Sequence, residues 1–158
     1  VLEMTGKPRD YQKAKLESLI KDFDLQKVRK NLGDQLSGGE RRRVEIARCL
    51  ANDPKFIMLD EPFAGVDPIQ VEEIQHIVWK LKYRNIGILI TDHNVDETLT
   101  ITDRAYLLFE GRILFQGTPE ELAENKTVKE KYLTTSFVLR KKDFQLLDEQ
   151  KKVREESE

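Results

Sequence analysis

The most constraining feature of the sequence is a short apolar run that ends in two carboxylates. Residues 56–59 are apolar without alternation, which predicts a parallel β-strand covered on both faces. Asp60 and Glu61 follow directly, and Pro62 ends the strand. Because ligands of open α/β sheets bind beyond the carboxyl ends of the strands, both carboxylates are expected at a ligand site.

Two carboxylates at a strand end suit a hydrated divalent cation and a water molecule that must lose a proton. In enzymes that cleave nucleoside triphosphates, the strand-end aspartate helps to hold Mg²⁺, while a second residue positions or deprotonates the attacking water. Asp60 and Glu61 are candidates for these two roles. The alternative interpretation is that they simply begin a polar loop.

A second strand is expected after the helix that follows the carboxylates. Asp67 before Pro68 predicts a helix N-cap with proline at the first helical position, and residues 68–83 carry apolar side chains at helical spacing. Residues 88–91 form another apolar run, so the order strand, helix, strand predicts a right-handed βαβ crossover with parallel strands.

His93 follows that second strand and is therefore expected at the same end of the sheet as Asp60 and Glu61. An imidazole at this position can donate a hydrogen bond to a terminal phosphate. The alternative is an ordinary surface histidine at the start of the next helix.

Another candidate site lies where a helix begins after residue 37. Ser37 and Glu40 have the spacing of a capping box. Gly38 and Gly39 each cost a helix up to about 1 kcal/mol relative to alanine. They make sense if backbone N–H groups must approach an anion closely, and an ordinary helix entry with flexible glycines is the alternative. The arginines at 41–43 fan around the helix, which predicts a solvated face with one or two local ion pairs.

Composition excludes several classes of protein. The 158 residues have a charged fraction of 35% and a net charge of -2, which does not fit a dedicated nucleic-acid binder. No apolar run reaches the length of a membrane span, and no signal peptide is expected. Cys49 lies in an apolar helical context and is expected to be buried.

The remaining elements follow from periodicity and turn signals. Helices are expected at 11–23, 95–101 and 118–123, and a hairpin at 105–115. The charged segment from residue 140 is expected to be frayed, with a partner-docked helix as the alternative. The predicted organisation is residues 1–52 as part of a helical subdomain, 53–139 as part of a nucleotide-binding core and 140–158 as a charged tail.

Together these motifs resemble the nucleotide-binding domains of ATP-binding cassette (ABC) proteins. Residues 36–40 match the family signature, 56–61 the Walker B strand with its catalytic glutamate, 64–67 the D-loop, and His93 the switch histidine. Their order and spacing also agree. The resemblance implies an α/β fold, namely the C-terminal part of an ABC-type P-loop ATPase domain. Within the family, residues 39–48, 59–69, 91–95 and 117–122 look most like ATPases that power lipopolysaccharide export.

The resemblance also assigns roles to individual residues. Asp60 would bind Mg²⁺ through water, Glu61 would act as general base, and His93 would hold the γ-phosphate of ATP. The signature residues would contact the γ-phosphate held by the other subunit of a head-to-tail homodimer, and Asp67 would cross that interface. The signature residues concerned are Ser37, Gly38 and Gly39. Transmembrane permease subunits would be the partners, at the cytoplasmic side of the inner membrane.

The family's phosphate-binding motif, Gly-x-x-x-x-Gly-Lys-Ser/Thr, does not occur in this sequence. The first residues, Val-Leu-Glu-Met-Thr-Gly, read as the interior of a larger protein. We therefore expect the chain alone to be inactive and to expose an unpaired apolar strand edge. Alternative functions are an ATPase of branched-chain amino acid importers, a non-transport ABC ATPase, or a truncated, non-catalytic dimerisation module.

Overall fold

The computed structural model describes residues 1–133, 137–139, 142 and 144–146. The chain divides into two units, residues 1–91 and residues 92–158, and each has its own buried side chains. The division expected from the sequence, at residues 52/53 and 139/140, stays a prediction. The charged tail falls largely outside the described residues, so neither interpretation of it is tested.

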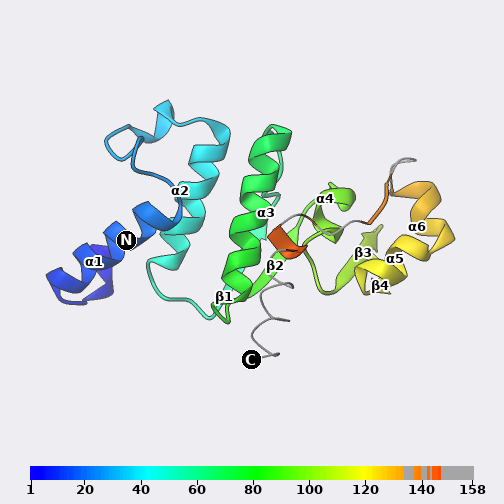
Figure 1. The fold of residues 1–158 in the computed structure, drawn as a ribbon. Coiled ribbons are helices and arrows are strands. Elements are labelled where there is room, and N and C mark those ends of the chain that lie inside the picture. Colours follow the sequence, from blue (N-terminus) through cyan, green and yellow to red (C-terminus); the bar gives the residue numbers. More distant parts are fainter. Residues whose placement is uncertain (134–136, 140–141, 143, 147–158) are drawn as a thin grey trace, which may run out of the picture. The chain divides into compact units, whose positions relative to one another are not determined.

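The first unit contains the helices and strands that were expected, with ends shifted by a few residues (Figure 1). Its elements are η1 (Leu2–Thr5), α1 (Arg9–Asp22), η2 (Gly33–Gln35), α2 (Gly38–Leu50), β1 (Phe56–Asp60), α3 (Pro68–Lys82) and β2 (Gly87–Thr91).

The two strands of the first unit pair in parallel, as predicted. Phe56 lies opposite Gly87, and Asp60 lies opposite Thr91 at the carboxyl ends of both strands. A Cβ atom at Gly87 would meet the Phe56 ring, so the missing side chain makes room for that cross-strand neighbour. Helix α3 connects the strands and contacts both α2 and β2. The core of this unit is formed by the buried side chains of Leu19, Ile20, Phe23, Leu25, Ile46, Ala47, Leu50, Ala51, Ile57, Leu59, Phe63, Val71, Ile74, Val78 and Leu81.

The prediction that β1 is covered on both faces is wrong for this chain. Ile57 is 4% exposed, whereas Phe56 is 57% and Met58 is 71% exposed. Successive side chains of a strand point to opposite faces, so one face of β1 is buried in the core and the other is open. Within the described residues β1 pairs with β2 alone, which confirms the expected unpaired edge.

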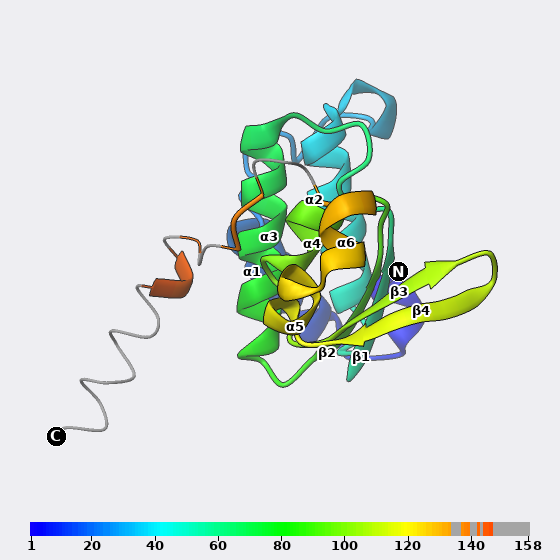
Figure 2. The same ribbon diagram turned by 90° about the vertical axis from the view of Figure 1, so that its right-hand side faces the viewer.

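The second unit combines a hairpin with short helices. Its elements are α4 (Val95–Leu99), β3 (Ala105–Phe109), β4 (Arg112–Gly117), α5 (Pro119–Glu124) and α6 (Lys126–Lys131). Figure 2 shows β3 and β4 as a twisted ribbon joined by a tight turn. Glu110 and Gly111 in that turn both have positive φ, 48° and 75°, as the favoured two-residue hairpin turns require.

One face of the hairpin packs on the core of the second unit. Leu99, Leu122 and Val128 are buried there, and the hairpin's Leu107 and Phe115 pack against them. Leu108 and Ile113 are exposed instead. The hairpin therefore buries one apolar face and leaves other apolar side chains open to solvent.

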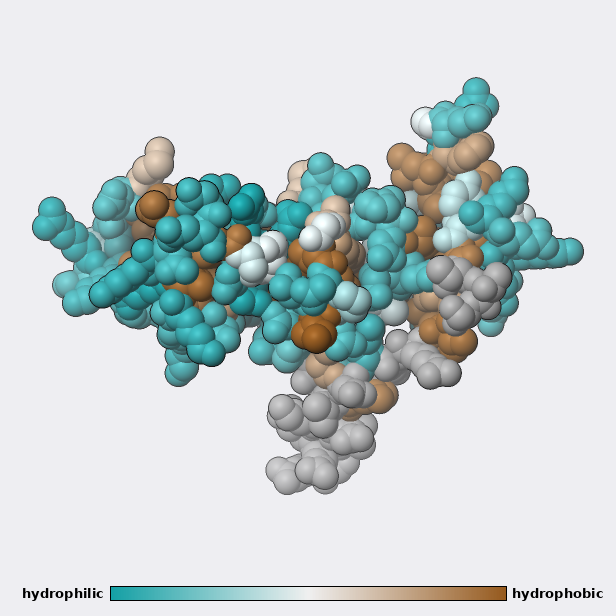
Figure 3. Space-filling view, turned by 90° about the horizontal axis from the view of Figure 1, so that it is seen from above, coloured by the Kyte–Doolittle hydropathy of each residue, from teal (hydrophilic) through white to brown (hydrophobic). Residues whose placement is uncertain are grey.

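The face seen in Figure 3 is mainly hydrophilic, with hydrophobic side chains emerging between the hydrophilic ones. Among the described residues, no helix combines the length and the apolar character that crossing a membrane requires. Cys49 is exposed, so the expectation that it is buried is wrong. Helix α2 turns Ile46, Ala47 and Leu50 toward the core, and Cys49 lies about 100° around the helix from Leu50.

Candidate functional site

The first predicted site residue, Asp60, is the last residue of β1. The hydroxyl of Thr91, its partner in the parallel register, donates a hydrogen bond to Asp60 Oδ1 at 2.5 Å. The two strand ends thus bring a carboxylate and a hydroxyl together, and both are exposed. Among the described residues no group of three or more His, Cys, Asp or Glu side chains is arranged to hold a metal ion.

Glu61 directly follows Asp60. Its φ is 45°, a backbone conformation that residues other than glycine rarely adopt. Its N–H donates to the carbonyl oxygen of Thr91 at 2.7 Å, and its carbonyl oxygen accepts from the N–H of Ala64 at 3.2 Å. Pro62 and Phe63, which come next, are buried. Hydrogen bonds and packing therefore fix the backbone that carries the Glu61 carboxylate.

Arg42 is a neighbour of Glu61 that sequence reasoning missed. Its Nη2 donates to the Glu61 carbonyl oxygen at 3.0 Å, while its Nη1 lies 2.9 Å from Glu45 Oε2 in an ion pair. Arg43 pairs with Glu73 on α3. The Arg42–Glu45 pair confirms a local ion pair for the arginines of α2, whereas the Arg43–Glu73 pair joins two helices. The Arg43 side chain is only 16% exposed, so the solvated face expected at 41–43 is wrong at this position. The spacing of Arg42 and Glu45 signals their own pair, but nothing in the sequence signals the contact with Glu61.

The capping box predicted at the start of α2 is confirmed. The N–H of Ser37 donates to Glu40 Oε2 at 2.8 Å, and the N–H of Glu40 donates to Ser37 Oγ at 3.3 Å. Hydrogen bonds from the Ser37 backbone and hydroxyl lower the pKa of Glu40 below its ordinary value. Ser37 therefore has a structural role as the cap at the start of the helix, whatever else it contacts.

Gly38 and Gly39 differ in their surroundings. A Cβ atom at Gly39 would overlap the side chain of Gln70, lying 2.6 Å from its Cδ. A Cβ atom at Gly38 would make only ordinary contacts, 3.5 Å from the Gly65 carbonyl oxygen and 3.6 Å from Val66 Cγ1. Packing explains the glycine at 39, and it leaves the glycine at 38 unexplained.

The start of α2 lies beside the loop after β1. A cavity of about 290 Å³ separates them, and the residues that line it are Gly38, Arg41, Arg42, Glu45, Ala64, Gly65 and Val66. The structure thus brings Gly38 next to the 64–67 stretch, whose last residue is Asp67. The Asp67 carboxylate caps α3, since Oδ1 accepts from the N–H groups of Ile69 at 3.0 Å and Gln70 at 3.1 Å. This confirms the predicted N-cap.

His93 belongs to the second unit, in the segment just before α4. Its Nδ1 lies 3.7 Å from Asp92 Oδ1, and its side chain is 72% exposed. Asn94, the next residue, caps α4 by accepting from the N–H of Glu97 at 3.3 Å. The gathering of His93 with Asp60 and Glu61 stays a prediction.

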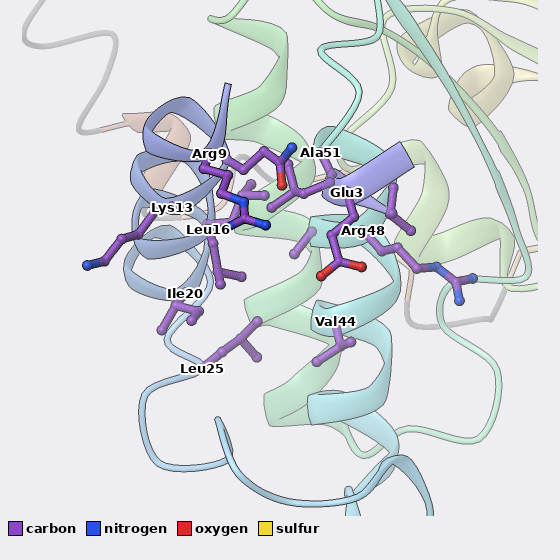
Figure 4. Close-up of a pocket in the computed structure, with 14 residues that line it drawn as sticks. Glu3, Arg9, Lys13, Leu16, Ile20, Leu25, Val44, Arg48 and Ala51 are labelled. Carbon is purple, nitrogen blue, oxygen red and sulfur yellow. The ribbon is translucent and has the colours of Figure 1, made fainter. Parts of the chain in front are cut away.

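A separate groove of about 920 Å³ lies between α1 and α2 (Figure 4). Leu16 and Ile20 of α1 face Val44 of α2 across it, and Arg9 and Arg48 also line it. None of the site residues predicted from the sequence lines this groove.

Comparison with known proteins places this arrangement in a family. Residues 2–64 match the family model for ABC transporters. The chain is 54% identical over 128 residues to the lipopolysaccharide export system ATP-binding protein LptB of Haemophilus influenzae, covering 81% of this chain and 53% of that protein. It is 52% identical over 121 residues to LptB of Escherichia coli K12, covering 77% of this chain and 50% of that protein.

A solved structure agrees with these sequence matches. The cbiO1 protein of Clostridium perfringens, part of an ABC transporter complex, superimposes with a TM-score of 0.70 at 32% identity and covers 79% of this chain and 50% of its own. The chain thus spans about half the length of the relatives it matches. The chain belongs to the ABC transporter ATP-binding family and forms part of a nucleotide-binding domain of that family.

Proposed function

We propose that this chain is part of the ATP-hydrolysing subunit of an ABC transporter that powers lipopolysaccharide export. The observation that carries the proposal is the pair Asp60 and Glu61 at the carboxyl end of a parallel strand, with Glu61 fixed through its backbone. The similarity to LptB proteins supports the assignment of lipopolysaccharide as the transported substrate.

Asp60 is proposed to hold Mg²⁺ through water. Carboxylate and hydroxyl oxygens are the donors that Mg²⁺ accepts, and in such sites it binds one or two carboxylates together with substrate phosphates. When bound, Mg²⁺ neutralises charge on the phosphates of ATP. The Thr91 hydroxyl donates to Asp60 Oδ1, so it restrains the carboxylate, and Oδ2 would be the oxygen that accepts from the cation's water shell.

Glu61 is proposed to accept the proton of the attacking water. Its carboxylate can act as a general base only when it is held within hydrogen-bond reach of that water. The bonds from its backbone to Thr91 and Ala64 restrict where the carboxylate can lie. His93 is proposed to donate a hydrogen bond to the γ-phosphate and so to stabilise charge that develops there.

A second subunit is proposed to complete each ATP site. Ser37, Gly38 and Gly39 would face the γ-phosphate of ATP bound by the other subunit, since the N-terminus of a helix favours an anion. Asp67 would lie at the same interface, beside the cavity that Gly38 lines. The assembled dimer would dock on transmembrane permease subunits at the cytoplasmic side of the inner membrane.

The ATPase assignment is tested by Glu61→Gln in the complete subunit that contains this chain. We expect loss of steady-state hydrolysis by about 10²- to 10⁴-fold, together with retained ATP and a trapped dimer. Glu124→Gln, an isosteric change at an exposed residue of the second unit, serves as the control and should leave hydrolysis unchanged. Near-normal hydrolysis by Glu61→Gln would refute the assignment.

The transported substrate is tested by purifying the complete subunit with its native membrane partners. In vesicles containing those partners, lipopolysaccharide should stimulate ATP hydrolysis, and hydrolysis should drive its extraction from the membrane. Stimulation by a branched-chain amino acid with its binding protein, and none by lipopolysaccharide, would assign the importer function instead.

By itself the 158-residue chain should neither bind ATP tightly nor hydrolyse it. Calorimetry with Mg²⁺ that gave micromolar ATP affinity would contradict that expectation.

A further inference from the structure

The strongest unassigned contact in the first unit joins helix α2 to the backbone of Glu61. Arg42 Nη2 donates to the Glu61 carbonyl oxygen at 3.0 Å, across 19 positions of sequence. Glu45, one turn further along α2, holds the other end of the guanidinium at 2.9 Å. Arg42 therefore bridges the helix that begins at Ser37 and the residue proposed as general base.

The conformation of Glu61 explains why such a bridge would matter. With φ at 45°, Glu61 occupies the left-handed region, which side chains with a Cβ atom enter at a cost in energy. A strained residue keeps its conformation only when its surroundings fix it. Backbone bonds to Thr91, Ala64 and Arg42 are among the restraints on Glu61.

Of these three restraints, Arg42 alone comes from a side chain. The bonds to Thr91 and Ala64 are made by backbone atoms, so substitution of those residues leaves them in place. The Arg42 side chain is 26% exposed, and Glu45 pairs with it, so the guanidinium is held in a defined position. A planar guanidinium can donate to both acceptors at once, whereas an ammonium is a single point charge on a flexible stem.

We propose that Arg42 is a positioning residue for Glu61, which fixes the carboxylate where it can meet the attacking water. This inference rests on the proposed role of Glu61 and extends it to a residue on the signature helix. Because a misplacement of about 1 Å can cost about a hundredfold in rate, the effect should fall on turnover and spare ATP binding.

The test is Arg42→Met in the complete ATPase subunit, a change that keeps much of the aliphatic stem and removes the donors. We expect kcat to fall about tenfold or more, with the KM for ATP unchanged. Arg42→Lys, which can still reach one acceptor, should recover part of kcat. Arg43→Met is the matched control, because it removes the adjacent guanidinium and its pair with Glu73 but no contact with Glu61.

Arg43→Met should lower the melting temperature and keep kcat. If Arg42→Met likewise lowers the melting temperature and keeps kcat, Arg42 is only structural and the inference is overturned. If the Arg42→Met subunit does not fold, Arg42→Lys and Glu45→Gln carry the same test of kcat against KM.

A double variant separates this inference from the proposed function. In a Glu61→Gln background, Arg42→Met should lower the residual rate little further, because both changes act through one carboxylate. A full tenfold further loss would show that Arg42 acts independently of Glu61 and would overturn the inference. Full activity of Glu61→Gln alone would overturn the proposed function itself.

Discussion

The different surroundings of the two glycines at the start of α2 lead to a paired prediction. At Gly38 an added Cβ atom would make ordinary contacts with the Gly65 carbonyl oxygen and Val66 Cγ1, at 3.5 and 3.6 Å. Replacing glycine by alanine in a helix gains up to about 1 kcal/mol. Gly38→Ala should therefore leave the free energy of unfolding unchanged or raise it by up to about 1 kcal/mol.

Gly39→Ala should behave in the opposite way. Its Cβ atom would lie 2.6 Å from Cδ and 2.9 Å from Cγ of Gln70, so that side chain must move. Overpacking of this kind costs about 1–3 kcal/mol. The helix gain of up to about 1 kcal/mol offsets part of this cost, so the net loss should be at most about 2 kcal/mol if the flexible Gln70 side chain relaxes. The net loss corresponds to a fall in melting temperature of about 2–4 °C for each kcal/mol in a protein of this size.

Urea unfolding of both variants measures these changes, and ATP hydrolysis by the complete subunit measures the function. If the Gly38 backbone approaches a γ-phosphate, Gly38→Ala should lose hydrolysis while keeping its stability. A stability loss above about 1 kcal/mol in Gly38→Ala would refute the packing argument. Full hydrolysis by a stable Gly38→Ala subunit would refute the phosphate contact and favour an ordinary helix entry.

Two further predictions follow from hydrogen bonds at helix starts. Asp67→Ala removes the acceptor for two N–H groups of α3 and should lower the free energy of unfolding by about 1 kcal/mol. In the same urea experiment Asp67→Ser, which keeps an acceptor, should retain most of the wild-type stability. The pKa of Glu40 lies below its ordinary value of 4.5 in the folded chain, so its contribution is fully present above pH 4.5 and is lost as pH falls through the folded-state pKa. A Glu40→Gln variant should therefore lose less stability than the wild type when the pH falls below 4.5. Unfolding curves of the variant that keep the wild-type pH dependence would contradict this.

The parts of the fold that follow local rules could be predicted from the sequence. Ser37 and Glu40 form the expected capping box, and Asp67 caps α3 before Pro68, because these bonds join residues two or three positions apart. The parallel pairing of Asp60 with Thr91 followed from the order strand, helix, strand. Such features depend on spacing that a single sequence displays.

Other features depend on neighbours that the local pattern does not specify. The apolar run of β1 indicates the surroundings that the strand favours, yet Met58 is exposed because the pleat turns it away from the core. Cys49 lies off the buried face of α2, although its sequence neighbours are apolar. The hydrogen bond from Arg42 to Glu61 joins residues 19 positions apart that only the tertiary fold brings together, so their spacing in the sequence does not predict it.

The central claim is that the Glu61 carboxylate takes the proton of the water that cleaves ATP. The most direct measurement is single-turnover cleavage of γ-labelled ATP by the complete subunit, carried out with and without Glu61→Gln at saturating Mg²⁺. The account predicts that the variant binds ATP with wild-type affinity and cleaves it at least about a hundredfold more slowly. Cleavage at a rate close to wild type would contradict it.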